Sequence, residues 1–138
     1  MDIEETIAAP YFKVQDVTEG VYLIGKSSHV LMNSASSSTN PKGLTMASAN
    51  YTQGDYAQYI WKVTAKDAGY TIQDVNGQYI NFTEQSGDQC SVVLSDIEQV
   101  LSITKRSDGS YGISYNGHYM NDFGETHTNV AGWRADDN

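Results

Sequence analysis

The sequence is poor in basic residues. It has eight Lys and Arg residues against 17 Asp and Glu, which gives a formal net charge of −9. A nucleic-acid-binding protein needs a basic face to neutralise phosphates, and anionic membrane surfaces attract basic segments. No apolar stretch approaches the ~20 residues of a membrane span. We therefore expect no nucleic-acid partner and no membrane insertion.

Cysteine is almost absent, and the residue types of common catalytic and metal sites are sparse. Cys90 is the one cysteine, so no disulfide can form within the chain, and its apolar neighbours favour a small buried side chain. The histidines His29, His118 and His127 lack the spacing of metal ligands. No nucleophile or phosphate-loop motif occurs. We expect no metal, no cofactor and no enzymatic activity.

The residues that are abundant favour strands and turns. The 138 residues include ten Tyr and 12 Gly, with many Asn, Ser and Thr, and no long segment has the composition of a helix. This length fits one domain. The dipeptides Asn76-Gly77 and Asn116-Gly117 are strong hairpin signals between alternating segments.

Three stretches of the chain repeat one pattern of four short segments, each with the alternation of a half-buried strand. Matching tyrosines, Tyr22, Tyr70 and Tyr111, begin a buried face of the second segment. Met32, Ile80 and Met120 occupy one place in the third segment. The expected strands are residues 12–14, 20–24, 30–33 and 43–48, then 61–63, 69–72, 78–81 and 90–95, then 101–103, 109–113, 118–121 and 129–134.

Twelve strands without a substantial helix predict an all-β protein. A propeller typically needs four to eight four-strand units, whereas three such units close as a six-strand barrel capped by three hairpins. The pattern therefore predicts a β-trefoil with pseudo-threefold symmetry. We expect the domain to span residues 11–138, with residues 1–10 as an N-terminal linker, and its repeats to cover about residues 11–58, 59–98 and 99–138.

Residues 61–81 carry the pattern best, as Trp61-Lys62-Val63, Gly69-Tyr70-Thr71-Ile72 and Asn76-Gly77-Gln78-Tyr79-Ile80-Asn81. This pattern resembles the ricin-type β-trefoil lectin family. Gln99-Val100-Leu101 stands near the place of the family's Gln-x-Trp signature. The resemblance implies a non-catalytic carbohydrate-binding module of a larger secreted or surface protein. It also implies an extracellular, cell-surface or periplasmic location, and the lack of disulfides fits a bacterial source.

Family members bind sugar with an acid after the third strand and with an aromatic residue a dozen positions later. Only the third repeat keeps this combination, because Met46 and Val93 stand where it has an aromatic residue. The resemblance therefore implies a carbohydrate site formed by Asn121, Asp122, His127, Trp133 and Asp136.

Four of these five residues also have a structural interpretation. Trp133 could cap a hairpin, Asp122 could lie in a turn, and His127 could lie in a solvated loop. Asn33, Asn81 and Asn121 recur at one place and could bind their own backbone at a strand end.

Two other functions compete with sugar binding. A trefoil can bind a protein through its loops, here residues 34–42 and 51–56, which are rich in Ser, Tyr, Gly and Asn. Alternatively, the domain could be a spacer without a ligand, joined to other domains of a longer chain.

Overall fold

The computed structural model describes residues 1–5, 12–13, 17–26, 29–48, 57–83, 87–123 and 129–136. These residues contain strands and no α-helix, so the predicted all-β class is confirmed. They also contain no helix long and apolar enough to cross a membrane. The strands are β1 (Asp2–Glu5), β2 (Phe12–Lys13), β3 (Gly20–Lys26), β4 (His29–Ala35), β5 (Leu44–Ser48), β6 (Trp61–Lys66), β7 (Gly69–Gln73), β8 (Tyr79–Phe82), β9 (Gln89–Cys90), β10 (Val92–Ser95), β11 (Ser102–Lys105), β12 (Tyr111–Tyr115), β13 (His118–Asp122) and β14 (Val130–Trp133).

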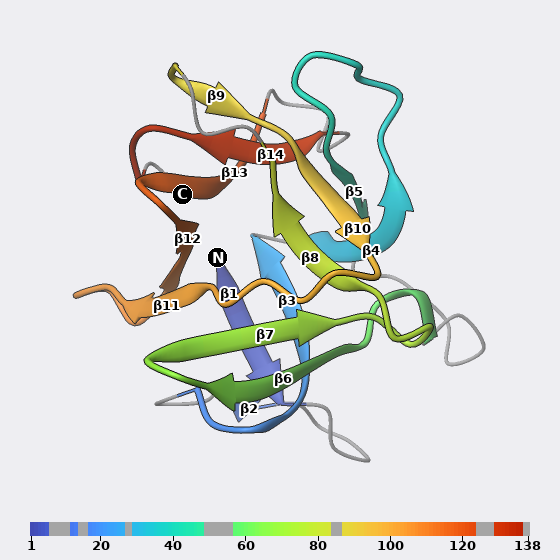
Figure 1. The fold of residues 1–138 in the computed structure, drawn as a ribbon. Helices are drawn as coiled ribbons and strands as arrows, with labels where there is room; N and C mark the ends of the chain where they lie inside the picture. Colours follow the sequence, from blue (N-terminus) through green and yellow to red (C-terminus); the bar gives the residue numbers. More distant parts are fainter. Residues whose placement is uncertain are drawn as a thin grey trace.

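The strands form one curled antiparallel sheet, in the order β10-β8-β7-β6-β3-β4-β5-β14-β13-β12-β11. Each of the twelve expected strands has a counterpart. The expected strand at residues 90–95 is broken at Ser91: β9 pairs with β14, whereas β10 pairs with β8. Figure 1 shows β9, β14 and β13 together at one end of the molecule and β6 and β7 at the other. The break places part of the second repeat against the third.

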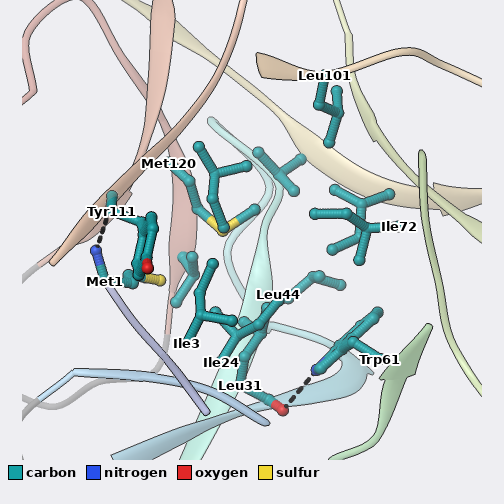
Figure 2. Close-up of a cluster of buried hydrophobic side chains, with 14 of the residues drawn as sticks. Met1, Ile3, Ile24, Leu31, Leu44, Trp61, Ile72, Leu101, Tyr111 and Met120 are labelled. Atoms are coloured by element: carbon teal, nitrogen blue, oxygen red, sulfur yellow. Dashed lines mark hydrogen bonds between the residues drawn. The ribbon is translucent and has the colours of Figure 1, made fainter. Parts of the chain in front are cut away.

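Large apolar side chains from all three repeats fill the interior (Figure 2). Trp61 is 0% exposed, and its Nε1 donates a hydrogen bond of 3.1 Å to the carbonyl oxygen of Leu31. Tyr22 and Tyr111 are buried as predicted, and Tyr70 packs half-buried against the same cluster. The buried indole therefore has its polar group satisfied, as a core tryptophan requires.

The prediction that Met32 occupies the buried position of Ile80 and Met120 is wrong by one residue. Leu31 is 0% exposed, whereas Met32 is only half-buried and packs on a smaller cluster. Leu31 pairs with Met46 in the way that Ile80 pairs with Leu94. A register shift between Leu31 and Ala35 marks a bulge in β4. Because side chains alternate along a strand, one residue of register exchanges the buried and exposed faces.

The prediction that residues 1–10 are a linker is also wrong for residues 1–5. Of these, Asp2–Glu5 form β1, which pairs with β3 and β2, and the side chains of Met1 and Ile3 are buried in the main core. The amide of Tyr111 donates a hydrogen bond of 2.9 Å to the carbonyl oxygen of Met1, and the amine of Met1 donates to the carbonyl oxygen of Tyr111 (Figure 2). Apolar residues at alternate positions let even an acidic segment join the sheet and bury one of its faces. Residues 6–11 lie outside the described ranges.

The fourth segments of the three repeats meet at one place. Leu44, Val92 and Val130 are all buried there, and Leu44 pairs directly with Val130. The amide of Val92 donates a hydrogen bond of 2.9 Å to the carbonyl oxygen of Lys42, and the amide of Lys42 donates one of 3.0 Å to Ser91 Oγ. These contacts fix the second repeat's β9 segment relative to β14.

Candidate functional site

Trp133 lies in a row of side chains that crosses three strands. It pairs with Tyr119 of β13 on one side and with Gln89 of β9 on the other. Residues directly opposite in antiparallel strands project from the same face. The phenol, the indole and the amide therefore lie side by side on the outer face of the sheet, since Met120 and Cys90, their chain neighbours, are buried.

Two further side chains contact the indole. The ring of Phe123 meets it edge to face, with centroids 6.3 Å apart and planes at 88°. The guanidinium carbon of Arg134 lies 5.2 Å from the centroid of the indole. The Trp133 surface, which we define as Gln89, Tyr119, Phe123, Trp133 and Arg134, is therefore an aromatic platform with polar groups at its border.

Three polar side-chain groups of this surface are available to a ligand. Among the described residues, the structure gives no hydrogen-bond partner to the Tyr119 hydroxyl, the Trp133 Nε1 or the Gln89 amide. The core residue Trp61, by contrast, donates its ring N–H to a carbonyl oxygen within the protein. Available donors and acceptors beside a half-buried aromatic ring are instead typical of ligand sites.

The segment that carries Gln89, residues 87–90, is held in place at both ends, and we call it the β9 arm. His118 Nε2 forms a hydrogen bond of 2.8 Å with the carbonyl oxygen of Gly87. At the other end, Cys90 packs inward against Gly132, where an added Cβ would overlap the Cys90 sulfur. Buried Cys90 thus has the structural role that the sequence favoured. The arm is rigidly placed beside Trp133.

Asn121 uses its side chain within the protein. Its Nδ2 donates hydrogen bonds of 3.1 Å to the Tyr119 carbonyl oxygen and 3.0 Å to the Ala135 carbonyl oxygen. Asn81 does the same in the second repeat, with the carbonyl oxygens of Tyr79 and Ile97. These bonds match the structural interpretation of the asparagines, and through Ala135 they tie the segment after Trp133 to β13.

Asn33 departs from this pattern. Its Nδ2 donates a hydrogen bond of 3.1 Å to Asp74 Oδ2 instead of binding two backbone carbonyls. The strand register explains the difference, because the bulge in β4 places Asn33 one residue away from the position of Asn81 and Asn121. The same register sets Ala47 and Ser95, not Met46 and Val93, at the place of Trp133. Neither residue is aromatic, so the third repeat is still the one repeat with an aromatic residue at this position.

Asp122 lies on the opposite face of β13 from Trp133. It follows Asn121 and pairs with Val130, which is buried in the core, and its own side chain is 0% exposed. Lys26 Nζ lies 4.0 Å from Asp122 Oδ2 and joins β3 to β13 by an ion pair. The alternation of side chains along a strand therefore separates this carboxylate from the Trp133 surface.

Asp136 forms an ion pair with Arg106, which follows β11. Arg106 donates from Nε at 2.9 Å and also from a terminal nitrogen, so the contact is bidentate. A hydrogen bond from Arg106, together with its charge, lowers the pKa of the Asp136 carboxyl below the usual 3.8. Asp136 thus anchors the segment after Trp133 to the β11–β12 hairpin.

This pair predicts a small loss of stability in acid. Because the pKa of Asp136 is lowered in the folded state, the pair stabilises the fold above the usual pKa and ceases to do so as pH falls through the lower folded value. We expect Asp136→Asn to cost at most about 1 kcal/mol at pH 7, since the pair is partly exposed. Urea unfolding from pH 7 to pH 2 should show this difference vanish. The control Asp96→Asn removes an exposed carboxyl, and a difference for Asp136→Asn that persists at pH 2 would contradict the assignment.

Three further features predicted from the sequence are His127 and the loops at residues 34–42 and 51–56. His127 and residues 51–56 lie outside the described residues. The loop after β4 packs on other repeats: Ser36 Oγ donates a hydrogen bond of 2.9 Å to Asn129 Oδ1, and Asn129 Nδ2 donates one of 3.3 Å to the Pro41 carbonyl oxygen. These contacts give this loop a structural role. Within the described ranges, no three His, Cys, Asp or Glu residues gather to hold a metal.

Four residues of the Trp133 surface were not predicted for the site: Gln89, Tyr119, Phe123 and Arg134. Tyr119 could have been found, because its pairing with Trp133 follows from the expected hairpin of the third repeat. Gln89 could not, because its pairing with Trp133 joins two repeats at a break in the expected strand.

Comparison with solved structures relates this fold to a known protein. The crystal structure of the Rhizoctonia solani agglutinin matches 89% of this chain and 91% of its own, with a TM-score of 0.64 and 18% sequence identity. At this identity the similarity shows the fold alone. No family model matches the chain, and no curated protein matches its sequence. The comparisons thus relate the chain to the fold of an agglutinin and indicate no catalytic family.

Proposed function

We propose that this chain is a β-trefoil of three four-strand repeats and a non-catalytic carbohydrate-binding module, with one site on the Trp133 surface. The observation that carries the proposal is the row of Tyr119, Trp133 and Gln89, whose side-chain polar groups have no partner among the described residues. The proposal includes an extracellular, cell-surface or periplasmic setting for a larger parent protein.

Three features support the trefoil arrangement. Leu44, Val92 and Val130, one from each repeat, meet at a common place. Asn81 and Asn121 make the same pair of backbone hydrogen bonds. The similar fold of an agglutinin adds weight to both the trefoil and the lectin-like function.

The chemistry of the Trp133 surface suits a sugar ring. The C–H face of a pyranose packs on an aromatic plane, and its hydroxyls need donors and acceptors at the border of that plane. The Gln89 amide supplies both kinds, the Tyr119 hydroxyl does likewise, and the indole supplies a donor. Asp122 and Asp136 have no contact with the ligand in this proposal, because both are engaged in ion pairs elsewhere.

A glycan array probed with the purified chain and with Trp133→Ala tests the proposal. We expect the wild-type chain to bind at least one glycan. Loss of the central aromatic residue should weaken that binding by about thirtyfold or more, as for the central residue of an interface. Circular dichroism should confirm that the variant is folded, since Trp133 is half-buried.

The matched control is Tyr79→Ala. Tyr79 occupies in β8 the place that Tyr119 has in β13, but it pairs with Ser95 and not with a tryptophan. Its removal should leave binding unchanged. If the wild-type chain binds no glycan of a broad panel, the proposed function is refuted. If Trp133→Ala binds as tightly as the wild type, the proposed site is refuted.

A further inference from the structure

The two arginines of the chain have opposite environments. Arg106 donates to Asp136 through two nitrogens and to Ser110 Oγ through the third, at 3.0 Å. Arg134 has two contacts among the described residues, an ion pair between Nε and Asp88 Oδ1 at 3.6 Å and the indole of Trp133. Arg106 is therefore a structural residue, whereas most donors of Arg134 are available.

The position of Arg134 makes these donors useful. Its guanidinium lies over the Trp133 ring, which attracts the cation, and its side chain is still 64% exposed. The contact with Asp88 involves Nε, so the fork formed by the two terminal nitrogens has no partner among the described residues. That fork matches the two oxygens of a carboxylate.

The ion pair with Asp88 is weak enough to be exchanged. The Asp88 side chain is 65% exposed, and its oxygen lies 3.6 Å from Arg134 Nε, beyond good hydrogen-bond distance. Exposed pairs of this kind contribute about 0–1 kcal/mol. A carboxylate on a ligand could take the place of Asp88 at small cost. Asp88 would then act as a competitor of the ligand and not as a contact.

We infer that the Trp133 surface prefers a sugar that carries a carboxylate, such as a uronic acid, with Arg134 as the specificity-determining residue. This inference rests on the proposed function. The sugar ring packs on the aromatic side chains of this surface, and its carboxylate accepts hydrogen bonds from the guanidinium of Arg134. The chain's net charge of −9 disfavours an extended polyanion, so the ligand has an isolated acidic residue.

Titration calorimetry tests this with oligosaccharides that end in glucuronic acid, in its methyl ester, or in glucose. We expect the acid to bind the wild-type chain at least about tenfold more tightly than the ester, as for a hydrogen bond to a charged group. Arg134→Gln should reduce the preference for the acid over the ester to about twofold or less, with both affinities measured on the same variant.

Asp88→Asn gives the sharper result, because the expected change is a gain. Removing the competing carboxylate should raise the affinity for the acid about twofold to fivefold, since an exposed pair contributes little. If Asp88 instead accepted hydrogen bonds from sugar hydroxyls, the same variant would weaken binding and overturn the inference.

Matched controls come from another exposed ion pair. Lys66 and Glu98 are 47% and 36% exposed in the second repeat, and Lys66→Gln and Glu98→Gln make the same changes of net charge. Neither variant should alter binding. If Lys66→Gln and Arg134→Gln had equal effects, the preference for the acid would arise from the net charge of the protein and not from Arg134, which would overturn the inference.

Failures of the two proposals can be told apart. If the chain binds glucose-terminated and acid-terminated glycans equally, the carboxylate preference is wrong and the sugar-binding function stands. If a sulfated sugar binds more tightly than the glucuronic acid, the preferred anionic group is not a carboxylate and the inference is wrong. Binding to none of these sugars, and to no glycan of the array, refutes the proposed function itself.

Discussion

Replacing Trp61 with alanine is expected to lower the free energy of unfolding by about 3–5 kcal/mol. Trp61 is 0% exposed and is among the largest side chains in the core, at the start of β6, where apolar residues from several strands surround it (Figure 2). Its removal would leave a cavity and take away the hydrogen bond that the Leu31 carbonyl oxygen accepts from the indole. Urea denaturation monitored by circular dichroism measures the loss.

Trp61→Phe separates the two contributions. Phenylalanine keeps most of the buried aromatic volume but cannot donate to the Leu31 carbonyl oxygen, so we expect a loss of about 1–3 kcal/mol. The order of stability should be wild type, Trp61→Phe, Trp61→Ala. A cost below about 1 kcal/mol for the alanine variant would mean that the hydrophobic core is not packed around this ring.

The second large effect is expected for Gly43→Ala, at about 3 kcal/mol or more. An added Cβ would overlap the Asn129 side-chain oxygen and the Val130 carbonyl oxygen and would lie 2.9 Å from the Val130 carbonyl carbon. The side chain of Asn129 can move, but the backbone of β14 cannot move without losing its pairing with β5. Over-packing against a rigid backbone costs more than against a flexible side chain.

Gly77→Ala provides the control for Gly43→Ala. Gly77 has a φ of +84° and open space around it, so its substitution costs only the strain of a left-handed residue, about 1 kcal/mol. Thermal unfolding of both variants gives the comparison. Equal stability of Gly43→Ala and wild type would contradict the close contact between the first and third repeats.

Local chemistry made most of the strands predictable. Asn116 and Gly117 adopt positive φ angles of 49° and 82°, as the dipeptide signal requires. Alternation placed the tyrosines Tyr22 and Tyr111 in the core. The bulge in β4 and the strand β1 were missed, because neither repeats elsewhere in the chain.

The site could be predicted only in part. Trp133 was identified because no other repeat has an aromatic residue at its place. The acids were a weaker guide, since the face on which a side chain lies depends on strand register. Asp122 falls on the core side for this reason. Gln89 and Asp88 reach the Trp133 surface through a contact between repeats, which no local pattern encodes.

The pairing of β9 with β14 makes the Trp133 surface a property of the folded chain only, because its two halves lie far apart in the sequence. A ligand that contacts Gln89 and Trp133 together has almost no affinity for the unfolded chain. Its binding energy is therefore added to the folding energy, by about 2.7 kcal/mol when its concentration is 100 times its dissociation constant. Even a weak sugar should raise the melting temperature of this protein, and it should protect the backbone amides of residues 87–90 from hydrogen exchange.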